Sequence, residues 1–347
     1  MTPPRVVALG PAQMRDRIVR LSVALQRCDA DEAAELPAGV EPTPCAPWAA
    51  SSIDGLADAS YNESKCAMRN IQLWRKPAPQ NEMEEPMPFA EGQQGRLYWR
   101  VDGRADAPPL LLLNSLGTDF AMWDQVVPLL CDSFRVLRMD TRGHGASDVP
   151  EGDYTIAGLA TDALSVLDAA GARTASVCGL SLGGMTALQL ALAAPQRVSA
   201  VVAANTSAQV AAQPWLDRAA VVRRDGMGAI VTAVMSRFFS DRFIADCPPS
   251  LETIRATFLS IAPEGYAACC AAISAVDLLD RLASLRQPVL VINGSRDVAT
   301  PPAEHGDRIA TAVPNARTVV LEAGHISAVE EPQAFAAAVR SFLGGAG

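Results

Sequence analysis

The sequence contains no long hydrophobic run and carries more negative than positive charge. No stretch of its 347 residues approaches the ~18 consecutive apolar residues that a membrane-spanning helix needs. The first residues also lack the charged and then apolar layout of a secretory signal. With 29 Lys and Arg against 38 Asp and Glu the net charge is −9, whereas nucleic acids are bound by basic patches. We therefore expect a cytoplasmic protein with no membrane or nucleic-acid partner. Because the net negative charge repels anions, an anionic ligand would need a cationic side chain at its binding site.

Patterns typical of metal and cofactor sites are also missing. The eight cysteines form no C-x-x-C pair, and Cys269 and Cys270 are adjacent, so we expect free thiols rather than a zinc or disulfide framework. No H-x-x-x-H motif or carboxylate–histidine cluster indicates a metal, and no G-x-G-x-x-G indicates a dinucleotide. The sequence predicts an activity that uses neither a metal nor a cofactor.

Lysine is confined to the first part of the chain. Lys65 and Lys76 are the only lysines, and residues 1–86 also contain proline-rich breaks and little periodicity. We predict that residues 1–86 are a poorly ordered extension outside the working domain, with a mis-assigned start and a native one at Met87. The alternative is a regulatory or partner-binding segment. Residues 87–347 would then form the folded domain.

Short apolar runs alternate with amphipathic helical periods through this second part. Such alternation predicts a mostly parallel central sheet with helices on both faces. Between about 206 and 285 the alternation stops and helical sequence dominates, which predicts a helical cap over one end of the sheet. The expected strands are 110–113, 134–139, 175–178, 198–203, 289–293 and 318–321; the expected helices are 156–167, 185–192, 303–311 and 335–342.

The strongest motif is Gly-Leu-Ser-Leu-Gly at 179–183, directly after a predicted strand and before a predicted helix. A G-x-S-x-G sequence in this setting is the nucleophile elbow of the α/β-hydrolase fold. Its glycines permit a tight turn that places the serine hydroxyl above the sheet. Ser181 is therefore the expected nucleophile.

A nucleophilic serine needs a base, and the chain has three histidines. In this class the chain order is Ser, acid, His, with the histidine after the last strand. His325 follows the last predicted strand and is the expected base. His144 lies in a tight glycine-rich loop, and we expect it to have a structural role. His305 lies in a polar helical stretch, and we expect it to be solvated.

The acid must lie between the serine and the histidine, on a loop at the same edge of the sheet. Asp297 follows the predicted strand 289–293 and fits this position. The location after the preceding strand holds Asn205 and Thr206, which carry no charge. A buried carboxylate would fix the imidazole tautomer and stabilise the imidazolium.

Two backbone N–H groups must stabilise the oxyanion of such a reaction. One is expected from Leu182, immediately after the nucleophile. The other is expected from the loop after strand 110–113, where Leu116 is the candidate. An ordinary strand-to-helix turn would produce the same local sequence.

From about Met87 to its end, the chain resembles the bacterial 3-oxoadipate enol-lactonases of the α/β-hydrolase fold. The elbow and the Arg-Gly-His-Gly loop occur in many hydrolases, whereas the cap segment Pro-Glu-Gly-Tyr with its paired cysteines is narrower. The matching segments are 114–118, 122–124, 140–148, 179–185, 204–206, 263–273, Asp297 with 300–302, and 324–327.

The resemblance implies hydrolysis of 3-oxoadipate enol-lactone to 3-oxoadipate in the β-ketoadipate pathway of aromatic degradation. The substrate carries a carboxylate, so a cation should face the pocket. Arg218 and Arg223 are the candidates, and a solvated helix face is the alternative for each. Trp123 is expected to line the pocket, although a core tryptophan would give the same pattern.

Other functions of this site are also compatible with the sequence. A carboxylesterase or a carbon–carbon bond hydrolase of the same fold would use the same triad, and an esterase would be indifferent to a substrate carboxylate. A non-catalytic receptor or scaffold of this fold would not need an intact triad. Turnover of the enol-lactone beside a neutral ester of similar size separates these possibilities.

Overall fold

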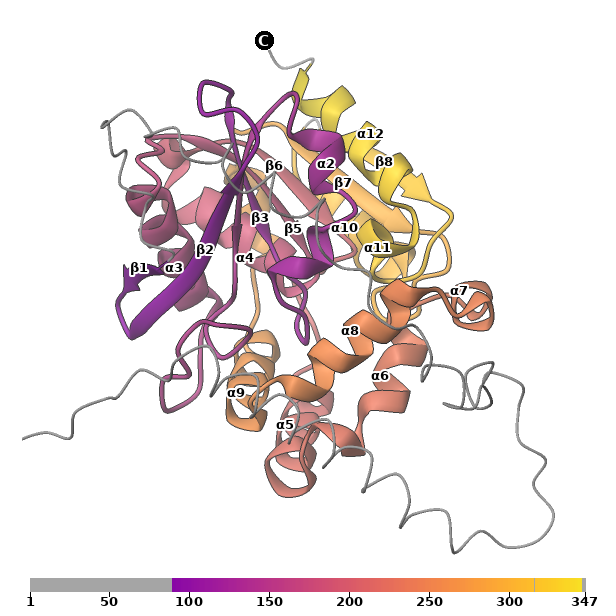
Figure 1. The fold of residues 1–347 in the computed structure, drawn as a ribbon. Helices are drawn as coiled ribbons and strands as arrows, with labels where there is room; N and C mark the ends of the chain where they lie inside the picture. Colours follow the sequence, from indigo (N-terminus) through magenta and orange to yellow (C-terminus); the bar gives the residue numbers. More distant parts are fainter. Residues whose placement is uncertain (1–88, 315, 345–347) are drawn as a thin grey trace, which may run out of the picture. The chain divides into compact units, whose positions relative to one another are not determined.

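The computed structural model describes residues 89–314 and 316–344, so the predicted extension at residues 1–86 lies outside the described residues. The described chain forms an eight-stranded sheet in the order β1-β2-β4-β3-β5-β6-β7-β8. The strands are β1 (Phe89–Gly92), β2 (Gly95–Asp102), β3 (Pro109–Leu113), β4 (Arg135–Met139), β5 (Ala175–Leu180), β6 (Val198–Ala204), β7 (Val289–Gly294) and β8 (Arg317–Leu321) (Figure 1).

The inner strands of the sheet are buried along almost their whole length. β3 reads Pro-Leu-Leu-Leu-Leu with all four leucines buried, and every residue of β7 is buried. From β4 to β8 all neighbouring strands pair in parallel, whereas β1 with β2 and β2 with β4 pair antiparallel. Continuous apolar runs are typical of parallel strands that are covered on both faces.

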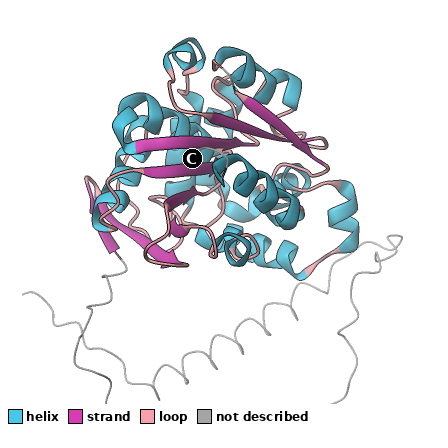
Figure 2. Cartoon of the chain, turned by 90° about the horizontal axis from the view of Figure 1, so that it is seen from above, coloured by secondary structure: helices cyan, strands magenta, loops and turns pink. Residues whose placement is uncertain are grey.

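Helices lie on both sides of this sheet (Figure 2). One of them, spanning 156–169, begins where the Thr155 hydroxyl accepts a hydrogen bond from the Gly158 N–H at 2.9 Å, and its apolar residues follow a helical period. The covering helices are α2 (Val127–Leu130), α3 (Ile156–Ala169), α4 (Leu182–Ala193), α10 (Gly306–Ala312), α11 (Ser327–Glu330) and α12 (Pro332–Gly344). α3 packs against α4, and α12 packs against α2.

The segment between β6 and β7 is helical and lies at one end of the sheet (Figure 1). It contains α5 (Gln213–Asp225), α6 (Val231–Phe238), α7 (Asp241–Asp246), α8 (Pro249–Ser260) and α9 (Pro263–Ser274). Among the described helices, none by itself is long and apolar enough to span a membrane. Taken together, α8 and α9 have the length and composition of a span, but the two helices meet at a bend of 97°.

The predicted fold class, a mostly parallel sheet with helices on both faces and a helical cap, is confirmed. The two antiparallel strands β1 and β2 were not predicted. β2 reads Gly-Arg-Leu-Tyr-Trp-Arg-Val-Asp, and only Leu97 and Trp99 of its residues are buried, so it lacks the continuous apolar run of the inner strands.

The paired cysteines lie on α9, and both are buried. Burial raises the pKa of Cys269 well above its usual value and that of Cys270 to about 12. A buried thiol with a raised pKa is a poor nucleophile. Both thiols therefore act as buried packing groups of α9, and the Cys269 sulfur also lies 3.9 Å from the Arg142 carbonyl oxygen outside the cap.

Candidate active site

Ser181 occupies a sharp turn between β5 and α4. Its φ of 57° and ψ of −115° lie in a region that non-glycine residues rarely adopt. The neighbouring glycines are required by space, because a Cβ on Gly179 would lie 2.0 Å from the Gly183 carbonyl oxygen and one on Gly183 would lie 2.1 Å from the Leu113 oxygen. The motif thus forms the strained elbow that the sequence predicts.

Two hydrogen bonds to its backbone groups hold this strained residue in place. The Ser181 N–H donates to the Ala204 carbonyl at 2.9 Å, and the Thr206 hydroxyl donates to the Ser181 carbonyl at 2.6 Å. Leu182 is the first residue of α4, so its N–H belongs to the helix terminus that lacks intrahelical partners. This N–H is in the position expected of an oxyanion donor.

His325 and Asp297 form a buried pair. The distance from His325 Nδ1 to Asp297 Oδ2 is 2.9 Å, and the two side chains are 4% and 0% exposed. An ionised carboxylate only accepts hydrogen bonds, so Nδ1 carries the proton and Nε2 is left to accept one. The Phe238 ring stacks on the imidazole with its centroid 6.0 Å away.

Several donors stabilise the ionised form of Asp297. Oδ1 accepts from the Ala299 and Thr300 N–H groups, and Oδ2 accepts from the Thr300 hydroxyl at 2.7 Å and from Asn205 Nδ2 at 3.1 Å. Burial alone would raise the pKa of this carboxyl, but His325 and the Thr300 donors outweigh burial and hold the pKa below its usual range. Asn205, considered above as an alternative acid position, is instead a donor to the acid.

The loop after β3 contains the second candidate oxyanion donor. The Ser115 N–H donates to Met122 Sδ at 3.4 Å, and the Gly117 N–H donates to His144 Nε2 at 3.1 Å. Within the described residues the structure records no protein acceptor for the Leu116 N–H, which lies between them. Leu116 itself lines the cavity that contains Ser181.

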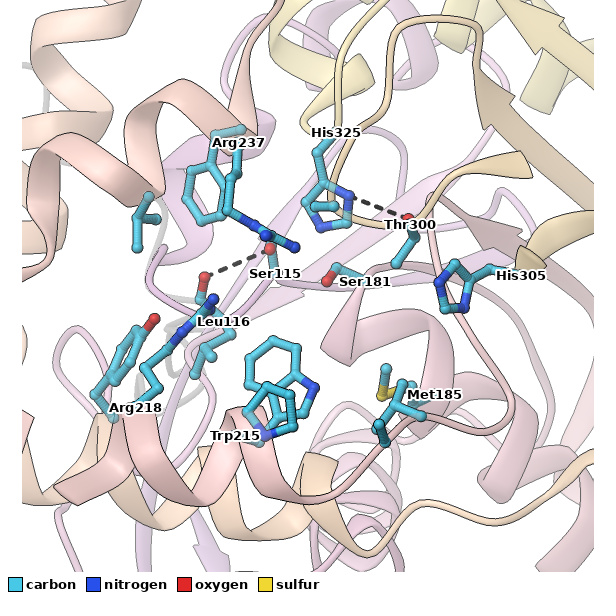
Figure 3. A pocket seen from close by; sticks show the side chains of 17 residues that line it. Ser115, Leu116, Ser181, Met185, Trp215, Arg218, Arg237, Thr300, His305 and His325 are labelled. Atoms are coloured by element: carbon cyan, nitrogen blue, oxygen red, sulfur yellow. Dashed lines mark hydrogen bonds between the residues drawn. The ribbon is translucent and has the colours of Figure 1, made fainter. Parts of the chain in front are cut away.

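A cavity of about 290 Å³ lies between the sheet end and the cap. Figure 3 shows Ser181 and His325 facing it, although no hydrogen bond between their side chains is recorded among the described residues. Its volume is at the lower end of the ~300–1,000 Å³ typical of small-molecule sites. The lining residues are Ser115, Leu116, Ser181, Met185, Val210, Ala211, Pro214, Trp215, Arg218, Val234, Arg237, Phe238, Tyr266, Ala299, Thr300, His305 and His325.

Two arginines face the cavity from the cap. Arg218 of α5 and Arg237 of α6 extend toward Ser115 and Leu116 (Figure 3), and neither has a carboxylate partner within the described part of the chain. Burial and the neighbouring Arg218 lower the pKa of Arg237, although a guanidinium stays charged at neutral pH. Arg237 was not predicted, because a single arginine on an amphipathic helix has no distinguishing local pattern.

Arg223 is not part of this cavity, which corrects one sequence prediction. Its guanidinium is paired with Asp153 at 2.7 Å and with Glu264 at 3.1 Å, and its side chain is 38% exposed. It connects α5 to α9 at the surface and does not contact the space above Ser181.

The prediction that Trp123 lines the pocket is also wrong. Trp123 is fully buried, donates from Nε1 to Asn114 Oδ1 at 2.8 Å and packs against Phe335. The tryptophan in the cavity wall is Trp215, whose ring stacks under the Arg218 guanidinium at 4.5 Å.

His305 lines the cavity and is half-buried, so the expectation that it is solvated is wrong. Its Nδ1 lies 2.9 Å from the Ser207 hydroxyl oxygen. That hydroxyl donates its one proton to the Gln209 carbonyl at 2.7 Å, so it accepts from Nδ1. Burial lowers the pKa of His305 and so favours the neutral imidazole, which when protonated at Nδ1 has no proton on Nε2. Figure 3 shows this imidazole on the opposite side of Ser181 from the two arginines.

Comparison with known proteins agrees with this geometry. Residues 108–246 match the family described as alpha/beta hydrolase fold. The chain is 40% identical over 252 residues to 3-oxoadipate enol-lactonase 2 of Acinetobacter baylyi, which covers 72% of this chain and 94% of the relative. It therefore belongs to the 3-oxoadipate enol-lactonase family of α/β hydrolases.

Solved structures show the same relationship. The enol-lactonase from Burkholderia xenovorans aligns with a TM-score of 0.72 and 41% identity, covering 74% of this chain and all of that one. An esterase from Thermogutta terrifontis aligns with a TM-score of 0.70 and 29% identity, covering 74% of this chain and 98% of that one. The fold is thus shared with enzymes of more than one hydrolytic activity.

The buried imidazole of His144 makes the stability of the folded protein depend on pH. Burial lowers the pKa of its imidazole from 6.5 to about 4. Between these pH values the imidazole is therefore protonated in the unfolded chain but neutral in the folded protein. The stability contributed by the neutral imidazole is therefore present above pH 6.5 and lost as the pH falls to about 4, by on the order of 3 kcal/mol.

We expect the difference in unfolding free energy between the wild type and His144→Gln to shrink over this range, as measured by urea denaturation at successive pH values. Asp140, whose pKa burial raises to about 6, titrates in both proteins and cancels in the comparison. A difference that stays constant from pH 7 to pH 4 would contradict the neutral buried state of His144.

Proposed function

We propose that this protein hydrolyses 3-oxoadipate enol-lactone to 3-oxoadipate in the β-ketoadipate pathway of aromatic degradation. One observation carries the proposal: Arg218 and Arg237, which have no acidic partner among residues 89–314 and 316–344, face the same small cavity as Ser181. The chain as a whole carries a net charge of −9, so these cations supply the local attraction that an anionic lactone needs. The enol-lactonase relatives support the same substrate class.

In the proposed first step Ser181 Oγ attacks the lactone carbonyl while His325 Nε2 accepts its proton. Asp297, held in its ionised form, keeps the imidazole in the required tautomer and stabilises the imidazolium. The negative charge that develops on the carbonyl oxygen is stabilised by the N–H groups of Leu182 and Leu116.

Ring opening breaks the bond between the carbonyl carbon and the ring oxygen. The leaving group is an enolate, which is a better leaving group than an alkoxide, and it takes a proton from His325. The resulting acyl chain stays attached to Ser181 and carries the enol, which becomes a ketone. Water activated by His325 then releases the product and restores the serine.

We place the substrate carboxylate between Arg218 and Arg237. The Arg218 guanidinium lies over the Trp215 ring, and Tyr266 forms part of the same wall, so the cationic end of the cavity is shaped by aromatic groups. Guanidinium groups suit this role because they present several donors to a carboxylate in a planar arrangement.

The triad assignment is tested by removing the nucleophile and the base. Ser181→Ala and His325→Ala should each lower the rate of lactone hydrolysis by several powers of ten, and the double variant should be no slower than the slower single variant, because the residues act as a unit. Circular dichroism establishes that each variant is folded. Activity within about tenfold of the wild type in either folded variant would exclude the mechanism.

The substrate-binding assignment is tested by Arg218→Met and Arg237→Met. A charge-assisted hydrogen bond contributes ~1.5–3 kcal/mol, so each change should raise KM for the enol-lactone about 10- to 150-fold. KM for 4-nitrophenyl acetate, which has no carboxylate to bind, should change much less.

Arg223→Met is the matched control for this experiment. It removes an arginine from the same helix as Arg218, but one that is exposed and paired outside the cavity, and exposed pairs contribute little. Both KM values should stay near those of the wild type. If the cavity variants affect the lactone and the neutral ester equally, the two arginines do not bind the carboxylate.

A further inference from the structure

The peptide that contains the Leu116 N–H is fixed on both sides. The N–H groups of Ser115 and Gly117 are both engaged within the protein, and the Thr118 N–H bonds to the Ser115 carbonyl at 3.3 Å. Gly117 has a φ of +83°, and a Cβ at this position would lie 2.8 Å from the Phe258 ring. The loop therefore needs glycine here and has little freedom to move toward the cap.

The acceptor for the Gly117 N–H is a buried histidine. His144 is 2% exposed, and its Nε2 accepts this hydrogen bond at 3.1 Å. Since an N–H group only donates, Nε2 has no proton, and Nδ1 carries the proton and faces the Arg142 carbonyl at 3.4 Å. His144 is therefore a neutral imidazole with a defined tautomer.

The loop that carries His144 is itself held firmly. The Asp140 carboxylate accepts from the Ala146 N–H and from the Phe120 N–H, each at 2.8 Å, so it connects this loop to the segment after the Leu116 loop. On its other side, a Cβ on Gly143 would lie 2.6 Å from the Gly265 Cα of α9. The loop that carries the imidazole is thus held by contacts with both the sheet end and the cap.

We propose that His144 is a positioning residue for the oxyanion site: by accepting the Gly117 N–H it orients the Leu116–Gly117 segment so that the Leu116 N–H faces the cavity. His144 does not line the cavity, so it acts through the loop and does not touch the substrate. The inference rests on the serine-hydrolase part of the proposed function and is independent of which ester or lactone is hydrolysed.

Two substitutions separate the acceptor from the bulk of the ring. In His144→Gln the side-chain oxygen can still accept from the Gly117 N–H, whereas His144→Phe keeps a ring but provides no acceptor. We expect His144→Phe to lower kcat for 4-nitrophenyl acetate by up to about 10²-fold with KM little changed, since loss of one oxyanion donor costs ~10²–10³ in kcat. His144→Gln should retain most of the wild-type kcat.

A transition-state analogue supplies a readout that a purely structural role would not change. An aryl trifluoromethyl ketone adds to the serine hydroxyl and places a negative oxygen in the oxyanion site. Its inhibition constant should rise in His144→Phe by the same factor by which kcat/KM for 4-nitrophenyl acetate falls, while KM for this ester should stay near the wild-type value. If KM alone changes, or if His144→Gln is as slow as His144→Phe, the proposal is wrong.

Tyr154→Phe is the matched control, because it removes one hydrogen bond of another buried ring, from the Tyr154 hydroxyl to the Pro150 carbonyl at 2.9 Å, away from the cavity. It should lower the melting temperature without changing kcat. A decrease in kcat as large as that of His144→Phe would show that kcat responds to any loss of packing in the domain, and it would overturn the proposal.

A measurement on the wild-type protein avoids substitution altogether. Nitrogen-15 NMR of the histidine side chains at pH 7 should show one imidazole that is neutral, protonated at Nδ1 and hydrogen-bonded as an acceptor at Nε2, whose signals are absent from His144→Gln. A His144 that is protonated at Nε2 would contradict the proposal even if His144→Phe did not fold.

Discussion

The strained backbone turn at Ser181 sets the geometry of the whole site. A non-glycine residue with φ near 57° costs of order 1–3 kcal/mol, so it persists only where surrounding structure enforces it. Here the enforcement comes from β6 through the Ala204 carbonyl, from Thr206, and from two glycines that bring α4 against the ends of β3 and β5. The turn projects the Ser181 hydroxyl above the sheet and starts α4 at Leu182, so the proposed nucleophile and one proposed oxyanion donor are placed by the same feature.

The charge arrangement around this turn divides the site into parts with different electrostatic roles. Asp297 is ionised, but its charge is surrounded by donors and directed at His325. The cationic charge of Arg218 and Arg237 is open to the cavity. Two neutral imidazoles, His144 and His305, add acceptors without adding charge. A negatively charged chain can in this way present a locally positive binding site.

Much of the fold was predictable, as was the placement of Ser181, Asp297 and His325 near one another, because the signals are local. The buried strands are continuous apolar runs, and the elbow is a five-residue motif whose glycines have a direct steric function. The identity of the cavity arginines was not predictable, because it depends on how the cap helices are oriented. Arg218 and Arg223 are five residues apart on α5, so they lie about 140° apart around the helix axis, and one faces the cavity while the other faces solvent. Trp123 gives the same pattern whether it lies in a core or in a cavity wall, and only the packing against Phe335 decides.

Acylation of Ser181 by the lactone can be detected by rapid-quench mass spectrometry of the wild-type protein. Because the leaving enol stays attached to the acyl group, we expect a transient adduct with the mass of the whole lactone on the peptide that contains Ser181. With 4-nitrophenyl acetate the adduct on the same peptide should be the acetyl group alone. Complete turnover of the lactone with no adduct on Ser181 at any time in the millisecond range, or an adduct on another residue, would show that Ser181 is not the nucleophile.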